Sequence, residues 1–533
     1  MMAPFRFVIV GGGTAGWMTA LLLAKRMAEP AMNQIRPVQI TLLEAPEIGI
    51  IGVGEGSTPS LKRFFQQLNI AESEWMPACQ ATYKTNIRFC HWTEAEYAGA
   101  KQAQQYSHPF LSQLDVHSEL AFYSNCFKRR CGLAVTTDPA KFLFNGWLAE
   151  RALAPVAGAH FPFRLEYGYH FDSGLLGQFL RQKAQALGVQ YQALTINQVE
   201  QWPDGCIRAV AGLNTSQQLM RIDADFFIDC SGFQAMLLQK VLQVPFQSFQ
   251  NNLFNDAAVV LPTAAQPELP VETTATALSN GWAWQIPLRH RTGNGYVYSS
   301  AFTSPETAER ELRTHLGLAD DVPARHLQMR VGQVSQHWHK NCLAVGLSQG
   351  FIEPLEATAL HLVQSTVESF IDCLVSHQYL QRADFANQQL AQQRFNSEIC
   401  NRFERVRDYI VAHYKLNNRH DSDYWRQNRA QSQLSESLLQ LLDVWYRRGD
   451  LAQEIARQQL DCHFGNTSWH CLLAGYQVFP ALLAPQPVAV SDAYLDSELA
   501  QLFTGCCLNF TAQSRLLSPA QDTAFSALMR TYA

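Results

Sequence analysis

Residues 5–16 read FRFVIVGGGTAG, a short apolar run that ends in a glycine-rich turn. The run Phe5–Val10 is mostly apolar and rich in strand-favouring residues, which is typical of a buried parallel strand. After the turn, residues 17–27 combine helix-forming residues with an apolar stripe, and residues 39–43 form a second strand-like run that ends at Glu44. This order of strand, glycine turn, helix, strand and acid predicts a βαβ unit of the dinucleotide-binding type.

The glycine turn is expected to hold the pyrophosphate of a nucleotide cofactor. Glycines let the backbone turn tightly and approach a phosphate, whose charge the N-terminus of the next helix stabilises. Glu44 is expected to accept hydrogen bonds from a ribose, and the polar segment 29–36 explains why it lies further from the turn than the usual ~20 residues. A turn that binds no ligand is the alternative, which the flanking strand, helix and acid disfavour. The expected cofactor contacts are Gly11, Gly13, Thr14, Ala15, Gly16 and Glu44.

Two later segments favour FAD over NAD. The strand-like run 225–229 enters a tight turn at Gly232, and residues 344–350 form another strand that leads to small residues ahead of a helix. Each would return the chain to the cofactor crevice at the carboxyl end of a strand. Several returns to one crevice suit a long, extended cofactor, so Gly232, Leu347 and Leu360 join the expected contacts.

Bulk composition disfavours several function classes. The 533 residues are 47% hydrophobic and 16% charged with a net charge of −5, which is typical of a globular protein and gives no basic surface for nucleic acid. Residues 7–24 are apolar but contain four glycines, so a strand–turn–helix fits them better than a signal peptide or membrane span. The 13 cysteines form no CxxC pair, which predicts reduced thiols in a cytoplasmic protein.

Several further segments resemble the flavin-dependent tryptophan halogenases. The most specific is Trp282–Pro287, which reads WAWQIP and fits the WxWxIP pattern of that family. The other matching segments are Gly52–Pro59, Tyr83-Lys84, His108–Phe110, Phe351–Thr358, His413-Tyr414 and Asp423–Arg426. They follow one another in the order of the family, from the N-terminus to about four-fifths of the chain.

The expected fold is α/β. It consists of an FAD-binding Rossmann-like domain of the flavin monooxygenase or halogenase type with inserted β-sheet segments, followed by a C-terminal helical module. The FAD-binding module with its substrate- and tunnel-forming insertions is expected over residues 1–385, and the mostly helical, substrate-covering module over residues 386–533. Within the first module, the Pro-, Ala- and Thr-rich run Pro262–Thr276 is predicted to be a surface loop.

The resemblance implies a reaction at two places in the protein. Oxygen activated on FADH2, which a separate flavin reductase supplies, oxidises chloride or bromide to a hypohalous acid. That acid passes through a tunnel to an indole-type or other electron-rich aromatic substrate, with tryptophan as one candidate. The resemblance leaves open a homodimer, while a nucleic acid, a membrane and a metal are not expected.

Lys84 and Glu356 are the predicted catalytic residues. Most lysines are solvated on the surface, but Ala81, Ile87 and Phe89 suggest a partly apolar setting, where Lys84 could hydrogen-bond a hypohalite or itself be halogenated. Glu356 is expected at a helix start, where an acid often serves only the helix dipole. By resemblance it would stabilise the cationic ring intermediate, accept its proton, or position the halogenating species with Lys84.

The remaining site predictions rest on the resemblance. Backbone N–H groups of Thr358 and Ala359 would hold the halide at a helix start. Trp282 and Trp284 would face one side of a strand, where such residues are more often core, and would keep the substrate away from the flavin. The rings expected to bind the substrate are His108, Phe110 and Trp469, of which the first two could equally be ordinary loop packing.

The chain departs from the family pattern at three points. Ala357 replaces the serine that commonly follows the glutamate, and Ala359 replaces a glycine, but backbone contacts to a halide survive both changes. Tryptophan-specific members carry a Tyr-Tyr pair and a glutamate that grip the amino acid, and residues 446–476 contain no such pair. This missing clamp makes free tryptophan a less secure substrate than another indole or electron-rich aromatic.

Two other functions compete with halogenation. An FAD-dependent aromatic monooxygenase would use the same fold, but such enzymes place a Gly-Asp turn where residues 346–349 read GLSQ. A non-catalytic flavoprotein would need neither Lys84 nor Glu356. His337 and His339 could be metal ligands from one strand face, but no third ligand is placed by spacing, so a solvated strand is expected there.

Overall fold

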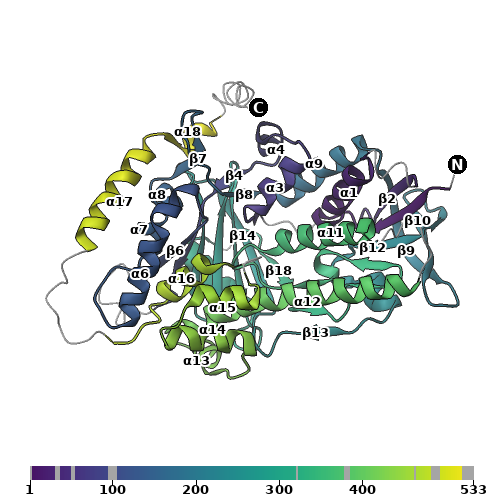
Figure 1. The fold of residues 1–533 in the computed structure, drawn as a ribbon. Coiled ribbons are helices and arrows are strands. Elements are labelled where there is room, and N and C mark those ends of the chain that lie inside the picture. The colour runs from purple at the N-terminus through teal and green to yellow at the C-terminus, as the bar shows by residue number, and fades with distance from the viewer. Residues whose placement is uncertain are drawn as a thin grey trace.

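The computed structural model describes residues 3–29, 36–47, 49, 54–93, 105–319, 322–376, 385–460, 464–481 and 492–518. Two large sheets lie next to each other in Figure 1, one towards the N-terminus and one at the centre, and helices cover them. Within the described ranges, no helix is long and apolar enough to span a bilayer.

The predicted βαβ unit lies in an eight-stranded sheet with the order β11-β10-β9-β2-β1-β12-β21-β20. Its strands are β1 Phe5–Val10, β2 Val38–Glu44, β9 Gln190–Gln201, β10 Ile207–Asn214, β11 Leu219–Asp223, β12 Phe226–Asp229, β20 Trp338–His339 and β21 Cys342–Ala344. The five strands from β9 to β21 pair in parallel, in agreement with the apolar runs at 5–10, 39–43 and 225–229. Because β1 is central, its residues Phe7–Val10 are buried on both faces.

Three helices cover one face of this sheet. α1 (Thr14–Met27) packs against α9 (Ser173–Ala186) and α11 (Ala359–Ser376). α1 starts directly after Gly13, three residues earlier than the apolar stripe predicts. Its N-terminus therefore opens at the carboxyl end of β1, as expected for a dinucleotide-binding unit.

The second large sheet has seven strands in the order β18-β14-β17-β16-β15-β5-β6. They are β5 Asn86–Cys90, β6 Gln105–Pro109, β14 Ala257–Ala264, β15 Glu272–Leu278, β16 Gly281–Pro287, β17 Arg291–Tyr298 and β18 Arg325–Gln328.

The predicted surface loop at Pro262–Thr276 is wrong, because β14 and β15 take up most of it. Proline is tolerated in β14 because β18 pairs only with Ala257–Val260, so Pro262 has a neighbouring strand on one side alone. The threonines of β15 favour a strand as much as a loop, since they are β-branched.

Smaller sheets complete the core. One contains β3 Glu55–Gly56, β8 Gly168–Phe171 and β4 Thr82–Lys84; another contains β13 Phe246–Ser248, β19 Gly332–Val334 and β22 Gly350–Phe351; and the third pairs β23 Phe510–Ala512 with β7 Leu153–Ala157. Only Thr85 separates β4 from β5. Lys84 therefore lies where the chain passes from a small sheet into the seven-stranded sheet.

The C-terminal part is helical, as predicted. Its helices are α12 Phe385–Leu416, α13 Asp423–Ala430, α14 Glu436–Tyr446, α15 Leu451–Gln458, α16 Asn466–Gly475, α17 Asp492–Cys507 and α18 Gln513–Leu516. The long helix α12 runs along the lower side of Figure 1 and contacts α11 and β20 of the first sheet as well as α13 and α14. A division into modules at residue 385 or 386 stays a prediction.

Candidate active site

The glycine turn after β1 leaves space for a phosphate group. Gly11 has φ +121°, and a Cβ there would overlap the carbonyl oxygen of Cys230. A Cβ on Gly13 would meet no atom within 4 Å, and Gly13 precedes α1 without a side-chain cap. The first N–H groups of α1 therefore face an open region beside Gly13, which fits the pyrophosphate of FAD.

The other predicted returns to this crevice also occur. β12 ends beside β1 and β21 ends beside β12, and Gly232 and Leu347 lie in the turns that follow these two strands. Asp229, at the end of β12, is fully buried, and its carboxylate accepts hydrogen bonds from the backbone of Leu237 and Leu238. This acid therefore caps a short helix and holds the turn in place.

Glu44 lies at the carboxyl end of β2, next to the glycine turn. The space that a Cβ on Gly12 would need is occupied by the Glu44 carboxylate, and Arg181 lies 3.9 Å from that carboxylate. Its position beside the turn fits the predicted contact with a ribose, which remains a prediction. Leu360 lies in the first turn of α11, whose partner α1 starts at the same crevice.

Lys84 is a fully buried lysine without a hydrogen-bond partner among the described residues. It ends β4, and its Nζ lies 5.4 Å from the centre of the Phe110 ring. Gly56 lies next to the amine, and a Cβ there would be 3.4 Å from both Lys84 Nζ and the Thr273 hydroxyl. Burial lowers the pKa of Lys84 to about 7, and the negative charge of Glu356 acts in the opposite direction.

Glu356 is also buried, but histidines surround its carboxylate. His108 Nδ1 lies 3.0 and 3.1 Å from the two carboxylate oxygens, and His413 Nε2 lies 3.1 Å from one of them. Burial raises the pKa of Glu356, yet the charges and hydrogen bonds of the two histidines outweigh it and bring this pKa to about 2. Glu356 is therefore an anion throughout the ordinary pH range.

Each histidine has a second partner that fixes its ring. His108 Nε2 lies 3.1 Å from the hydroxyl of Ser468, and His413 Nδ1 lies 2.8 Å from the hydroxyl of Tyr476. A hydroxyl can donate or accept, so each ring has a partner at both nitrogens whichever of them carries the proton. His413 has no local sequence signal for this role, and only its inclusion in the family pattern marked it.

The predicted substrate-binding rings belong to the same group. Phe110 lies beside Lys84 and His108 beside Glu356. Trp469 of α16 reaches them through Tyr409, whose ring is 4.8 Å from Trp469 and 6.1 Å from His108. The lid predicted to lack an amino-acid clamp spans residues 446–476, of which 461–463 lie outside the described residues. Parts of two other predicted segments, 30–35 of the polar segment and 52–53 of the matching segment Gly52–Pro59, lie outside them as well.

Trp282 and Trp284 both lie on β16, as predicted, with ring centroids 6.1 Å apart. Both are buried, and the indole N–H of Trp282 donates to Glu353 over 2.9 Å. Glu353 was not singled out by the sequence, although it belongs to the matching segment Phe351–Thr358.

The helix start predicted at Glu356 is wrong by three residues, because α11 begins at Ala359. Ala357, which lies between Glu356 and the first residue of α11, adopts a left-handed conformation with φ +55° and so cannot be part of the helix. Thr358 and Ala359 therefore mark the true helix start, where backbone N–H groups have no acceptor within the helix. The hydroxyl of Thr358 is buried and has no partner among the described residues.

The expectation of a solvated strand at His337 and His339 is also wrong. His337 is completely buried and stacks on Phe403, and burial lowers its pKa to about 3. Across the described residues, no group of histidines, cysteines or acids could hold a metal ion. The sequence did not signal this burial because the histidine contacts a residue 66 positions away.

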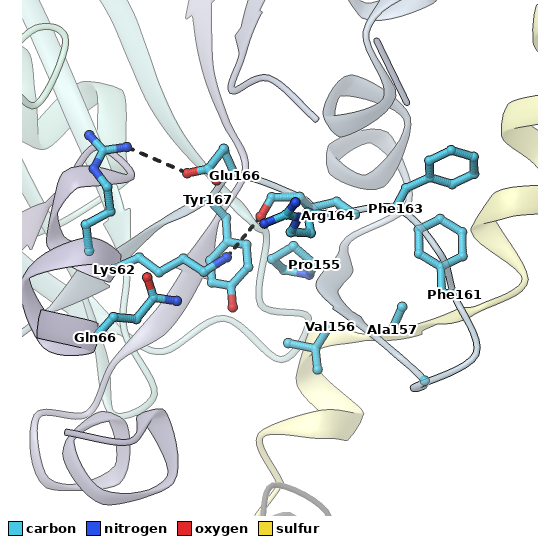
Figure 2. A pocket seen from close by; sticks show the side chains of 13 residues that line it. Lys62, Gln66, Pro155, Val156, Ala157, Phe161, Phe163, Arg164, Glu166 and Tyr167 are labelled. Carbon is cyan, nitrogen blue, oxygen red and sulfur yellow. Dashed lines mark hydrogen bonds and ion pairs between the residues drawn. The ribbon is translucent and has the colours of Figure 1, made fainter. Parts of the chain in front are cut away.

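A groove elsewhere on the protein contains none of the predicted site residues. Figure 2 shows its lining, in which Lys62 donates to the carbonyl of Leu165 and lies over the ring of Tyr167. The hydroxyls of Tyr167 and Tyr83 both bind Glu72. Since Tyr83 and Lys84 point to opposite faces of β4, the groove lies on the side away from Lys84.

Comparisons with known proteins identify the family of the chain. A family model described as tryptophan halogenase matches residues 6–492. The chain is 36% identical over 459 residues to the 7-chloro-L-tryptophan 6-halogenase KtzR of Kutzneria sp. (strain 744), which covers 82% of this chain and 84% of that protein. It is 32% identical to the tryptophan 7-halogenase RebH of Lentzea aerocolonigenes, over 90% and 91% of the two chains. The solved flavin-dependent halogenase Xcc4156 from Xanthomonas campestris has a TM-score of 0.79 at 31% identity, over 97% and 98%.

Proposed function

The chain belongs to the tryptophan halogenase family, and from that premise we propose that Lys84 and Glu356 direct a halogen onto an indole-type substrate. As a member of the family, the chain is an enzyme that halogenates an aromatic substrate with FADH2, a halide and oxygen, and a separate reductase supplies the reduced flavin. The residues that would hold FAD are those around Gly11–Gly16, with Gly232 and Leu347. When bound, the flavin supplies the oxidising power for the halide.

One observation carries the proposed roles: a buried lysine without an acceptor among the described residues lies beside Phe110, and a buried anion lies beside His108, two residues earlier in the chain. The Lys84 ammonium has hydrogen-bond donors to spare, because no described residue accepts from it. A hypohalous acid beside Phe110 could accept such a hydrogen bond on its oxygen, which makes the halogen more electrophilic. The neighbouring Glu356 anion can stabilise the positive charge that develops on the substrate ring. Together with its two histidines, it would also receive the proton that the ring then loses.

We propose an indole without an amino-acid head group as the preferred substrate. KtzR is named for 7-chloro-L-tryptophan and RebH for tryptophan, but residues 446–476 of this chain carry no Tyr-Tyr pair. His108 and Phe110 lie next to Glu356 and Lys84, so a flat ring between them would meet both catalytic residues. Among the described residues of this group, Lys84 is the one lysine or arginine that could bind a substrate carboxylate.

The test is a halogenation assay with the purified protein, FAD, a flavin reductase, NADH, oxygen and bromide. We expect indole to gain bromine and lose hydrogen, as measured by mass spectrometry, with tryptophan converted more slowly at equal concentration. Incorporation of oxygen that depends on substrate and not on bromide would instead show a monooxygenase. Faster conversion of tryptophan than of indole would contradict the substrate proposal alone.

A further inference from the structure

Glu353 lies at the centre of a buried hydrogen-bond network that contains Trp282. One of its carboxylate oxygens, Oε2, accepts from Trp282 Nε1 over 2.9 Å, from Asn255 Nδ2 over 2.8 Å and from the Tyr414 hydroxyl over 2.8 Å. Glu353 is fully buried, and Tyr424 donates to the other side of Asn255 over 2.9 Å. The protein thus surrounds one carboxylate oxygen with three donors from three separate segments.

Burial of the Glu353 carboxylate is unfavourable for folding and therefore needs an explanation. A carboxylate removed from water loses far more solvation than a neutral side chain, and burial raises the pKa of Glu353 accordingly. None of the three hydrogen-bond donors to Glu353 is a lysine, an arginine or a histidine, so none of them offsets this loss of solvation with a positive charge. An apolar residue would fill the same space more cheaply, so the carboxylate must be explained by the three donors that it holds in place.

Glu353 and Glu356 each bind one of two neighbouring residues of α12. Glu356 accepts from His413, and Glu353 accepts from Tyr414. Two acids three residues apart therefore fix two consecutive residues of one helix. This double contact sets the position of α12 relative to the segment that carries Glu356.

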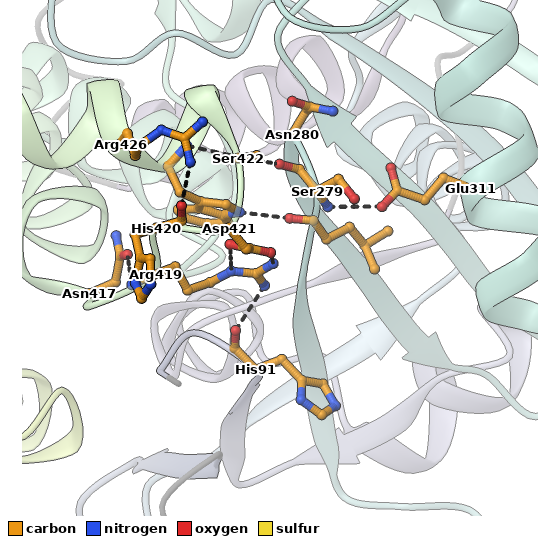
Figure 3. A network of polar contacts seen from close by, with 12 residues as sticks. His91, Ser279, Asn280, Glu311, Asn417, Arg419, His420, Asp421, Ser422 and Arg426 are labelled. Carbon is orange, nitrogen blue, oxygen red and sulfur yellow. Dashed lines mark hydrogen bonds and ion pairs between the residues drawn. The ribbon is translucent and has the colours of Figure 1, made fainter. Parts of the chain in front are cut away.

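The turn between β15 and β16 is held by the next helix, α13, and by the serine before it. Ser422 Oγ donates to the carbonyl of Ser279 over 2.6 Å, and Trp425 Nε1 donates to that of Leu278 over 2.8 Å. Figure 3 shows Ser279 between Ser422 and Glu311, with Arg419 and Asp421 nearby. The hairpin that carries the two tryptophans is therefore fixed at its turn, and Glu353 fixes the Trp282 ring itself.

We propose that Glu353 is a positioning residue that holds Trp282 and α12 in register with the Glu356–His413 pair. The inference rests on the proposed function, in which Trp282 is part of the wall between substrate and flavin. Without Glu353, the Trp282 indole N–H loses its acceptor among the described residues and the Tyr414 hydroxyl loses an acceptor too. The wall then loosens, and oxidising equivalents escape before they reach the substrate.

The test measures coupling, the amount of bromoindole formed per NADH consumed, together with hydrogen peroxide and free hypobromite. Glu353→Leu should lower coupling about tenfold while the rate of flavin oxidation stays within twofold of the unaltered protein. Glu353→Gln should keep coupling within about twofold, because an amide oxygen can replace Oε2 and Oε1 has no partner among the described residues.

A pair of tyrosine variants provides the matched control and does not depend on the folding of Glu353→Leu. Tyr414→Phe removes one donor to Glu353 and should lower coupling two- to threefold. Tyr167→Phe removes a buried hydroxyl that likewise donates to a glutamate, Glu72, over 2.8 Å, on the side of the protein away from Lys84, and should leave coupling unchanged. Wild-type coupling in both Glu353→Leu and Tyr414→Phe, or equal losses in the two tyrosine variants, would overturn the inference. Failure of the unaltered protein to brominate indole would instead contradict the proposed function.

Discussion

Lys84 and Glu356 are both buried and ionisable, but the protein supplies hydrogen-bond partners to only one of them. The Glu356 carboxylate receives hydrogen bonds from two histidines, each fixed in turn by a hydroxyl. The Lys84 ammonium finds no acceptor for its hydrogen bonds among the described residues and lies against an aromatic ring. Accordingly, the pKa of Glu356 moves towards the charged form and that of Lys84 towards the neutral form.

This difference separates two tasks. A group that must bind a small, transient oxidant needs donors that no protein atom has already taken. A group that must present a charge at a fixed place needs partners that hold it there. The unpaired lysine is unfavourable for folding, which is typical of residues kept for function rather than stability.

The largest effect is expected from Lys84→Met, which keeps the volume and removes the amine. Halogenation should fall at least a hundredfold while flavin oxidation continues, and the protein should become more stable. A shift of the pKa from 10.5 to about 7 corresponds to an upper limit of about 5 kcal/mol of destabilisation at pH below 7. This destabilisation disappears as the pH rises from 7 towards 10.5, because the lysine is then neutral in the unfolded chain too.

Thermal unfolding at pH 6 and pH 10 measures this stability, with exposed Lys240→Met as the control. The melting temperature of Lys84→Met should exceed that of the unaltered protein at pH 6 and approach it at pH 10, whereas Lys240→Met should change neither. A Lys84→Met protein that is no more stable at pH 6 would show that the amine has a partner in solution, and the contrast with Glu356 would fail.

A smaller effect is expected from Glu356→Gln. An amide oxygen in the place of Oε1 could still accept from both histidines, but the amide N–H₂ in the place of Oε2 would face His108 Nδ1, and the negative charge would be lost. We expect halogenation to slow about 10- to 100-fold at an unchanged Michaelis constant for bromide, as measured by product formation under saturating oxygen. An unchanged rate would mean that the charge between the histidines is not used in the reaction.

The smallest expected effect is a pH dependence set by Lys84. If the ammonium donates to the hypohalous acid, bromoindole formed per flavin oxidised should fall about tenfold from pH 6 to pH 8, because the pKa is about 7. Glu356, with a pKa of about 2, should add no further change down to about pH 4. A yield that rises over this range would identify the neutral amine as the reacting form. The Lys84→Met protein, which lacks the amine, is the control for the pH dependence of the yield in both pH ranges.

Local patterns predicted the cofactor part of the fold well. β1, α1, β2 and β12 each have a continuous apolar signal, and the glycine turn between the first two has a fixed spacing. The loop predicted at Pro262–Thr276 was wrong because it rested on composition. Proline and threonine are typical of loops, and the sequence does not show that Pro262 has a neighbouring strand on one side alone.

The candidate site was predictable only through the family pattern. Lys84, His108 and Glu356 are separated by up to 272 positions, and no local rule brings them together. The partners that explain their chemistry lie equally far away: His413 is 57 residues from Glu356, and Trp282 is 71 from Glu353. A histidine in the middle of a helix has the same local sequence whether it binds an acid or packs in a core.

The cofactor crevice is assembled from distant thirds of the chain, which constrains how the protein can be made. A Cβ on Gly346 would lie 2.7 Å from that of Ala15, so the first and last turns of the crevice touch through nearly bare backbone. β12 separates β1 from β21 in the sheet. A ribosome adds about 5 to 20 residues per second, so tens of seconds pass between synthesis of the first turn and of the last. During that interval the nascent chain has no complete place for a flavin, and we expect cofactor capture to be a late, largely post-translational event.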